Sequence, residues 1–459
     1  MAAERLADSG LADTEAIRLA GRITYGVDRV TAGAVREMGY EGFVEWQLDY
    51  DRIDDSELEN ALRSELPTLS MDAAELAEYL RNQDQFGLAQ RELLIATLIR
   101  RAYSPRQLYE RMVEFWSDHF NVPVNNPIAA ALKPLEDREV IRPLAMGRFE
   151  DLLQADARSP AMLYYLDNFN NTADGPNENY SRELMELHTL GFDGGYTEED
   201  VKEAARMFTG WTIRPPGQFL FRPRNHDYGE KHVLGERFLP GVGLREGERL
   251  LTLLAEHPST ALHIVTKLAR RFYADQPDED VVAAVADAFT ASHGDIRQTL
   301  RALLLHPTVL AAEAQKLKRP GEFVAGVLRG LEIPPNENVI RAAFSSLDAS
   351  GHLPFQWPAP NGYPDVRPYW QSSTGFLVRF NAAYAWTRET PGRSPLLSVS
   401  RGFRNTAQQV DFLAAALIPQ GIDTKTHGEI AAYAATLARR DRPAAIAALL
   451  FAGPDNQWR

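Results

Sequence analysis

The sequence predicts a mainly α-helical protein, a large helical array or toroid-like single domain with a small inserted β-ribbon. Apolar residues recur with the spacing of amphipathic helices along most of the 459 residues. Strand-like runs are confined to one region, near residues 211–240. No fixed-period repeat and no change in composition marks a boundary, so we predict one domain, although the length also allows two or three.

Capped helices are predicted throughout the first quarter of the chain. One helix begins near Thr14 and ends at Gly26. Helical spacing then continues through residues 32–49, 71–83 and 89–104. These segments form the N-terminal part of the predicted array.

The helix predicted over residues 104–120 has the clearest apolar face. Ser104 is a suitable N-cap, and Pro105 suits the first helical position. Its apolar side chains fall at i, i+4, i+7 and i+8, and they are Leu108, Met112, Phe115 and Trp116. This face is expected to be buried.

Breaks and caps are more frequent in the middle of the chain. A turn-rich break covers residues 121–134, and two helices are expected to meet at the Ser-Pro step of residues 159–160. Residues 168–176, with the sequence NFNNTADGP, have the composition of a loop. A further helix begins at Thr197, a good N-cap followed by acidic residues, and ends at Gly210.

The region near residues 211–240 contains the runs WTI, QFLFRP and KHVLG, which are separated by turn-rich segments and predict the β-ribbon. Helical spacing returns after it. Residues 345–375 interrupt the pattern with five prolines and two tryptophans, as functional loops and lids often do. We therefore predict a helical domain at residues 1–390 and a C-terminal helical segment at 391–459 that packs on it.

The composition restricts the partners and the compartment. A formal net charge of −14 disfavours unaided binding to nucleic acid or to an anionic membrane. No apolar run reaches the about 18 residues of a transmembrane helix, and the first residues lack the pattern of a secretory signal. The absence of cysteine excludes disulfides and thiolate chemistry. We therefore expect a soluble cytoplasmic protein with no nucleic-acid or membrane partner.

The stretch NENYSRELMELHTLG, residues 177–191, concentrates polar side chains on one predicted helix. Asn177 or Asn179 can cap its N-terminus, and Gly191 can end it. The stripe that we expect to be buried contains Tyr180, Leu184, Leu187 and Gly191. The polar stripe contains Asn179, Arg182, Glu183 and Glu186. His188 lies at the edge of the buried stripe.

The polar stripe has two interpretations. It can face water, with Arg182 and Glu186 forming an i,i+4 pair that contributes only about 0.2–0.5 kcal/mol. Alternatively, it lines a pocket, where Glu183 and Glu186 repel each other unless Arg182 or a cation lies between them. A shared, partly buried site would raise the pKa of one glutamate, which suits a general acid.

His119 and the segment 224–235 are two further candidates. His119 borders an apolar helix face, where a histidine is either packed and hydrogen-bonded or a ligand. The segment RNHDYGEKHVLG can be a polar hairpin tip. Alternatively, it is a loop that delivers His226 and Asp227, or Lys231, to a cleft.

Several catalytic motifs are absent from the sequence. It contains no Gly-x-Ser-x-Gly, no P-loop, no Gly-x-Gly-x-x-Gly and no His-Glu-x-x-His. Serine hydrolases of the nucleophile-elbow type, P-loop NTPases, Rossmann oxidoreductases and zincins are therefore disfavoured. The order Glu183-x-x-Glu186-x-His188 also departs from the Glu-x-x-His of di-metal helical bundles.

Six segments resemble one bacterial family in their sequence and order. They are RMVEFWSDHFNV (111–122), SPAMLYYLDN (159–168), PNENYSRELMELHTLGFDGGYTEEDVKEAARMFTGW (176–211), HDYGEKHVLG (226–235), TKLARRFYAD (266–275) and KRPGEFVAGVLRGL (318–331). The chain resembles the family called domain of unknown function 1800 over roughly residues 15–385. The resemblance implies no activity, but it implies a neighbouring partner protein of the alkaline-phosphatase-like type, and export of many relatives. The family's aromatic-Gly-Trp element is altered here to WPAPNGYPDVRPYW.

The first functional hypothesis is a hydrolase or lyase that acts on a carbohydrate-like polymer or conjugate by carboxylate general acid/base chemistry, with no cofactor required. In it, Glu183 or Glu186 is the acid, Glu178 or Asp227 the base, and Arg182 the partner that tunes their charge. The predicted catalytic residues are Glu183, Glu186, Arg182, Glu178, His188 and Asp227. The predicted substrate-binding residues are Asn177, Asn179, Trp116, Trp211, His226, Lys231 and Trp357.

Two other hypotheses stay open at this point. One is a metal- or haem-dependent enzyme that uses His119, His188 and His226 as ligands. The other is a non-catalytic assembly or adaptor protein, in which Arg182 is buried against its glutamates. Convergence of the named side chains in one open cavity would distinguish these hypotheses.

Overall fold

The computed structural model describes residues 13–83, 87–313, 316–389 and 394–459. Helices dominate these ranges, whose strands form two small antiparallel sheets. The prediction of a mainly α-helical protein with a small inserted ribbon is therefore confirmed. Within the same ranges, no helix combines the length and the apolar character needed to cross a membrane.

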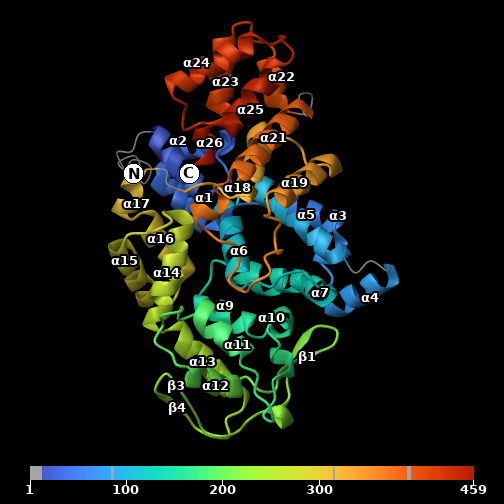
Figure 1. Cartoon of the computed structure of the whole chain (residues 1–459), viewed down its shortest axis with the longest axis vertical. Coiled ribbons are helices and arrows are strands. Elements are labelled where there is room, and N and C mark those ends of the chain that lie inside the picture. The colour runs from blue at the N-terminus through green and yellow to red at the C-terminus, as the bar shows by residue number, and fades with distance from the viewer. Residues whose placement is uncertain (1–12, 84–86, 314–315, 390–393) are drawn as a thin grey trace.

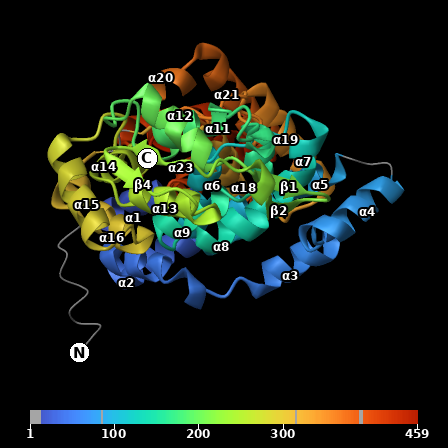
Figure 2. The ribbon, with the colours of Figure 1, turned by 90° about the horizontal axis from the view of Figure 1, so that it is seen from below.

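The N-terminal helices reach from one side of the molecule, where α2 lies, to the opposite edge, where α4 lies, with α6 at the centre (Figure 1). They are α1 (Asp13–Ile23), α2 (Arg29–Leu48), α3 (Ser56–Glu65), α4 (Ala73–Gln83), α5 (Leu88–Tyr103), α6 (Gln107–His119) and α7 (Pro127–Glu136). Helices α3 and α4 form an arm along one edge (Figure 2). The predicted apolar face of α6 is buried. The helix begins three residues after the predicted cap, Ser104, whose Oγ accepts from the Arg106 amide at 3.0 Å.

The middle of the chain forms shorter helices and two π-helical turns. They are a π-turn (Asp137–Ile141), α8 (Arg142–Leu144), α9 (Phe149–Asp156), α10 (Pro160–Tyr165), α11 (Asn179–Glu183), a π-turn (Leu184–His188) and α12 (Glu198–Met207). Thr197 caps α12 in a capping box with Asp200, as its position in the sequence predicts.

The predicted ribbon consists of two separate hairpins. Strand β1 (Trp211–Arg214) pairs with β2 (Gln218–Phe221), and β3 (Lys231–Val233) pairs with β4 (Glu236–Phe238). A 3-10 turn at residues 223–225 separates them, and its first residue is a proline, which cannot donate to a strand ladder.

Helices return after the hairpins and continue to the C-terminal region. They are α13 (Leu244–Ala255), α14 (Pro258–Phe272), α15 (Glu279–Ala291), α16 (Ile296–Leu304), α17 (Pro307–Ala311), α18 (Pro320–Leu331), α19 (Glu337–Ala349), α20 (Arg367–Trp370), α21 (Ser373–Glu389), α22 (Pro395–Ser400), α23 (Thr406–Leu417), α24 (Thr424–Ala435), α25 (Arg442–Ala452) and α26 (Pro454–Gln457). The loop predicted at residues 345–375 is therefore irregular only at 350–366 and 371–372.

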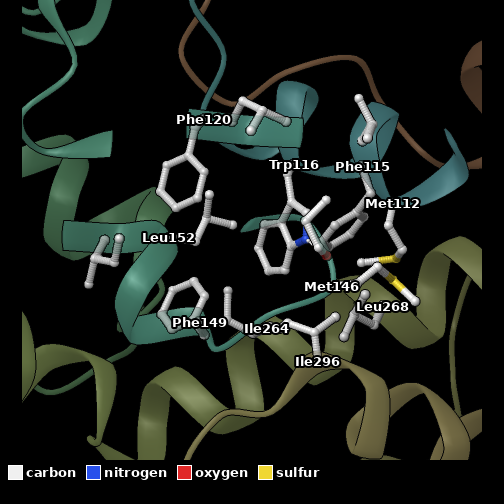
Figure 3. Close-up of a cluster of buried hydrophobic side chains, with 14 of the residues drawn as sticks. Met112, Phe115, Trp116, Phe120, Met146, Phe149, Leu152, Ile264, Leu268 and Ile296 are labelled. Carbon is white, nitrogen blue, oxygen red and sulfur yellow. Dashed lines mark hydrogen bonds between the residues drawn. The ribbon is translucent and has the colours of Figure 1, made fainter. Parts of the chain in front are cut away.

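Two large apolar clusters organise this array. The larger extends from α1 to α17, and Figure 3 shows its centre, where Trp116, Phe120 and Phe149 pack together. The smaller joins α18, α19 and α21 to α22–α25, at the end of the molecule opposite to the hairpins (Figure 1). Contacts of α21 with α25 cross the predicted boundary at residue 390. Helices α6 and α18 lie between the two ends (Figure 1).

Candidate functional site

The C-terminal end of α6 presents an apolar face to the core and polar side chains to α14. Trp116 is fully buried in the larger cluster, and its Nε1 donates to the carbonyl oxygen of Ala145 at 2.9 Å (Figure 3). It therefore packs the core and has no open surface for the predicted substrate contact. Asp118 and His119, which follow, contact Arg271 and Lys267 of α14.

Both ring nitrogens of His119 are engaged. Nε2 lies 3.1 Å from the carbonyl oxygen of His188, which can only accept, so Nε2 carries the proton. Nδ1 is then an acceptor, and Nζ of Lys267 donates to it at 2.8 Å. Burial and the neighbouring Lys267 charge hold the pKa of His119 well below its ordinary value. The ring is therefore neutral at physiological pH.

The predicted helix at residues 177–191 ends in a π-turn. At the start of this helix, Asn177 Oδ1 accepts from the amide of Asn179 at 2.9 Å. Asn177 is half-buried, and Asn179 is exposed. The turn at Leu184–His188 has i→i+5 hydrogen bonds and so holds one residue more than an α-turn. It buries His188 and leaves Leu187 only half-buried. The helix ends at His188, with Thr189 as its C-cap, and Gly191, three residues later, has a φ of 84°.

His188 is a fully buried histidine without a hydrogen bond at either ring nitrogen. Its ring centroid lies 5.9 Å from that of His119 and 5.0 Å from that of Phe120. Burial, followed by the charge of Lys267, lowers its pKa to about 3. It therefore contributes a neutral ring and, through its backbone, the acceptor for His119.

His263 and Lys267 complete the group, although neither is among the residues predicted from the sequence. They stand at i,i+4 on α14, so they share one helix face. Nε2 of His263 donates to the carbonyl oxygen of Leu187 at 3.0 Å, and its ring centroid lies 6.3 Å from that of His119. Burial, then Lys267, lowers the pKa of His263 to about 4. We call His119, His188, His263 and Lys267 the histidine–lysine cluster.

Lys267 is the cationic member of this cluster, and it is partly buried. Within the described ranges, no carboxylate lies at ion-pair distance from its Nζ, which donates to His119. Burial lowers its pKa to about 8, with help from Arg271 and Arg270, although Asp118 favours the charged form. A fraction of such amines is neutral near physiological pH, the state that accepts a proton or acts as a nucleophile.

Lys267 and His119 line a cavity of about 260 Å³ between α6, α14 and the segment 361–366. The other polar or aromatic residues of its wall are Phe115, Asp118, Arg270, Arg271, Asn361, Tyr363 and Asp365. A wider cleft of about 1290 Å³ adjoins this cavity, because Arg270 and Val366 line both. Side chains of α1 and α26 border that outer cleft.

The loop after α19 forms one wall of the cavity because residue 362 is a glycine. Gly362 has a φ of 69°, and a Cβ there would lie 2.0 Å from the carbonyl oxygen of Asp118. Nδ2 of Asn121 fixes the same loop by donating to the carbonyl oxygens of Trp357 at 2.9 Å and Ala359 at 2.7 Å. The loop is therefore held against the end of α6.

Arginines neutralise the carboxylates of α6 next to the cavity. Buried Glu114 lies 2.6 Å from Arg319, 3.2 Å from Arg101 and 3.3 Å from Arg271. Although burial opposes it, Arg101 and Arg319 hold the pKa of Glu114 well below its ordinary value. Asp118 accepts from Arg319 at 2.8 Å and from Arg271 at 3.0 Å. These carboxylates have several cationic partners, whereas Lys267 has no anionic one at ion-pair distance among the described residues.

The polar stripe of the predicted helix lines neither the cavity nor the outer cleft. Arg182 is half-exposed and pairs with Glu198 at 2.6 Å and Glu178 at 3.2 Å. The predicted Arg182–Glu186 pair is wrong, because Glu198 at the start of α12 binds both terminal nitrogens of the guanidinium. Burial and Glu186 raise the pKa of half-buried Glu183, although the stripe does not line the pocket in which this rise was expected.

The segment predicted to deliver side chains to a cleft is folded into a hydrogen-bonded network. His226 is buried, and its Nε2 contacts Glu246. Nζ of buried Lys231 donates to Glu246 at 2.9 Å and to two carbonyl oxygens of the preceding turn. Asp227 accepts from Arg206 at 2.7 Å. None of these residues lines the cavity or the outer cleft.

The remaining predicted tryptophans differ in their surroundings. Trp211 is fully buried, with the Arg158 guanidinium carbon 5.2 Å from its ring centroid. Trp357 is half-buried, and its Nε1 donates to Asn361 at 2.8 Å while its ring centroid lies 5.2 Å from that of Tyr363. Asn361 and Tyr363 line the cavity, and Trp357 contacts both of them. Trp357 is therefore the predicted substrate-binding residue that supports the cavity wall.

The three histidines predicted as metal ligands do not form one group. His119 and His188 belong to the histidine–lysine cluster, whereas Glu246 holds His226 beside β3. Across the described ranges, no three His, Asp or Glu side chains are arranged to hold a metal ion. The third ring beside His119 is that of His263.

Comparison with known proteins matches nearly the whole chain to one family. The family model described as "Protein of unknown function (DUF1800)" matches residues 18–458. This match includes the C-terminal helices, beyond the segments in which the sequence motifs lie. No curated protein and no solved structure matches the sequence.

Proposed function

The chain belongs to the DUF1800 family, whose description assigns no activity, and we propose that it is a lyase or hydrolase acting on an anionic, carbohydrate-like polymer or conjugate. The amine of Lys267 is the observation that carries this proposal. It lines the 260 Å³ cavity and donates to the neutral ring of His119 at 2.8 Å. Such an amine can take a proton from a substrate carbon or return one to a leaving group at neutral pH.

The walls of the cavity and of the outer cleft support the substrate class. Arg270 lines both, and no described carboxylate lies at ion-pair distance from it, so it can bind an acidic group. Tyr363 in the cavity and Trp458 in the cleft offer aromatic surfaces to sugar rings. At about 1290 Å³, the cleft exceeds the space that a small metabolite fills, which favours a polymer or conjugate.

Three residues of the proposed site share the work of proton transfer and binding. Lys267 transfers the proton, His119 orients the amine, and Arg270 binds the acidic group. Glu183 and Glu186 remain a second proposed acid–base pair, which the raised pKa of Glu183 supports.

Turnover of acidic oligosaccharides tests the proposal. Oligogalacturonates and alginate oligomers are incubated with the protein, and products are followed by new reducing ends and by the ultraviolet absorbance of an unsaturated uronate. Lys267→Met should lower kcat by about 100-fold or more. The control Lys202→Met, at an exposed position on α12, should leave it unchanged. A larger loss in Glu183→Gln would assign the proton transfer to the glutamate pair, and wild-type inactivity on both substrates counts against the substrate class.

A partner protein is a second proposal, supported by one exposed face of α21. Leu377, Phe380 and Tyr384 stand at i, i+3 and i+7, with 59%, 45% and 41% of their surface exposed. The family resemblance favours a partner of the alkaline-phosphatase-like type. Co-expression with such a neighbour and gel filtration test the proposal, because Phe380→Asp should separate a pair that the wild type holds together.

A further inference from the structure

We propose that Lys267 is also a nucleophile, which forms an imine with the carbonyl carbon of a small 2-oxo acid in the cavity. This inference rests on the proposed function, because it names the substrate class of the same cavity, acidic sugars with a 2-oxo group among them. The reaction needs an amine with an available lone pair, a cation that holds the carboxylate and a space of matching size. The cavity provides all three.

The hydrogen bond to His119 orients the amine. Nε2 of His119 donates to the carbonyl oxygen of His188, so its Nδ1 can only accept. One N–H bond of Lys267 therefore points toward His119. Among the described residues, no carboxylate at ion-pair distance competes for the other positions on the nitrogen. The lone pair of the neutral amine is consequently available to a molecule in the cavity.

Arg270 is the cation that holds the carboxylate. It follows Lys267 at i,i+3 on α14, so both side chains leave the same side of the helix and both line the cavity. Its Nε donates to the carbonyl oxygen of Asp275 at 3.2 Å, and this contact leaves the two terminal nitrogens for a ligand. A carboxylate on Arg270 brings the adjacent carbonyl carbon toward Lys267.

The size of the cavity limits what reacts there. About 260 Å³ lies below the range of about 300–1,000 Å³ that is usual for drug-sized ligands. A 2-oxo acid of a few carbons fits, and a longer substituent can extend past Arg270 and Val366 into the outer cleft. The cavity is therefore suited to the reacting end of the substrate.

The step balances without an oxidant. The lone pair of neutral Nζ forms a bond to the carbonyl carbon, and the carbonyl oxygen leaves as water with the two protons that the nitrogen loses. The resulting C=N bond, once protonated, draws electrons from the neighbouring carbon–carbon or carbon–hydrogen bond. This is the activation that a lyase requires.

Reductive trapping tests the inference. The wild-type protein is incubated at neutral pH with glyoxylate and sodium cyanoborohydride, and intact mass and peptide mapping locate the carboxymethyl group that reduction leaves on an amine. We expect Lys267 to be labelled first and faster than the exposed Lys202 or the buried Lys231. Arg270→Gln should slow labelling of Lys267 about tenfold at low glyoxylate, because a charge-assisted hydrogen bond to the carboxylate is lost. Lys267→Arg should remove the selective label.

A second probe separates this inference from the proposed function. Oxalate has two carboxylates and no reactive ketone or aldehyde carbon, so it tests the anion site alone by thermal shift and by competition with labelling. Oxalate binding that depends on Arg270, without selective labelling of Lys267, overturns the imine and leaves the anion site standing. Uniform labelling of all lysines, together with no oxalate binding, overturns both the imine at Lys267 and the anion site at Arg270. The wild-type labelling pattern decides the matter even where a variant fails to fold.

Discussion

Two histidine–lysine pairs in this chain combine the same residue types in opposite ways. In the pair beside β3, the carboxylate of Glu246 contacts both His226 and Lys231, and the Lys231 amine has three acceptors. In the pair between α6 and α14, Lys267 donates directly to His119. No described carboxylate there takes the place that Glu246 takes in the other pair.

This difference separates a structural network from a reactive one. A buried lysine whose protons all have acceptors is held in one position. A partly buried lysine beside a neutral ring loses water without gaining an anion, so its proton is weakly held. The second arrangement favours proton transfer, and the first favours stability.

Exchanging each lysine for methionine gives the largest expected contrast. Lys231→Met removes the cation from a buried Glu246, so we expect a loss of about 3–5 kcal/mol in the free energy of unfolding. Lys267→Met removes an amine without a carboxylate partner, so we expect a change within about 1 kcal/mol at pH 7. Urea unfolding followed by circular dichroism measures both. Equal losses in the two variants would show that the pairs do not differ in this way.

Acid should weaken the histidine–lysine cluster at His188. The folded pKa of His188 is about 3, below its ordinary value of 6.5, so the unfolded chain binds more protons between these values. Stability is therefore lost as pH falls below 6.5, and His188 alone accounts for about 2 kcal/mol at pH 5. His188→Phe has no ring to protonate, so it should not lose this contribution in acid. The free energy of unfolding should therefore fall less between pH 7 and pH 5 in this variant than in the wild type. An unchanged difference would mean that the His188 ring is not held neutral.

Alkali should act in the opposite direction at Lys267. Its folded pKa of about 8 lies below the ordinary 10.5, so the unfolded chain holds more protons between these values. The wild type should therefore gain stability relative to Lys267→Met as pH rises from 8 to 10. The charged groups that face the amine are Asp118 from α6, Arg270 and Arg271 from α14, and Asp365 from the loop. Unfolding midpoints of both proteins across this range measure the effect, and a constant difference between them contradicts it.

The smallest effect is expected at Arg182, the centre of the polar stripe. Its ion pairs with Glu178 and Glu198 are partly exposed, so Arg182→Ala should cost about 1 kcal/mol or less. Added salt should reduce the difference further. A thermal melt with and without salt checks this, and a loss as large as that of Lys231→Met would show that the stripe is structurally essential.

Elements with local signals could be predicted from the sequence. The apolar face of α6 and the cap at Thr197 each depend on residues within one or two turns, and the structure has both. The helix predicted to end at Gly191 ends three residues earlier, at His188. The strand-like character of residues 211–240 was also predicted, although Pro223 divides the ribbon into two hairpins.

The site could be predicted only in part, because it depends on contacts between distant segments. His119 and His188 were recognised as candidates, but they meet a face of α14 that has the ordinary pattern of an amphipathic helix. The i,i+4 spacing of His263 and Lys267 was the available signal. Its meaning depends on two distant contacts. His263 contacts the carbonyl oxygen of Leu187, 76 residues away in the chain, and Lys267 contacts the ring of His119, 148 residues away.

The π-turn at residues 184–188 makes this site sensitive to insertions and deletions. Because the turn holds one residue more than an α-turn, deleting Leu187 would allow a regular helix to form. The wide i→i+5 turn would then be lost, and the His188 carbonyl that fixes the His119 ring would move from its present position. Single-residue length changes at this turn should therefore be tolerated less well than most substitutions there, so reading-frame-preserving deletions are a sharper genetic probe of the site than alanine scanning.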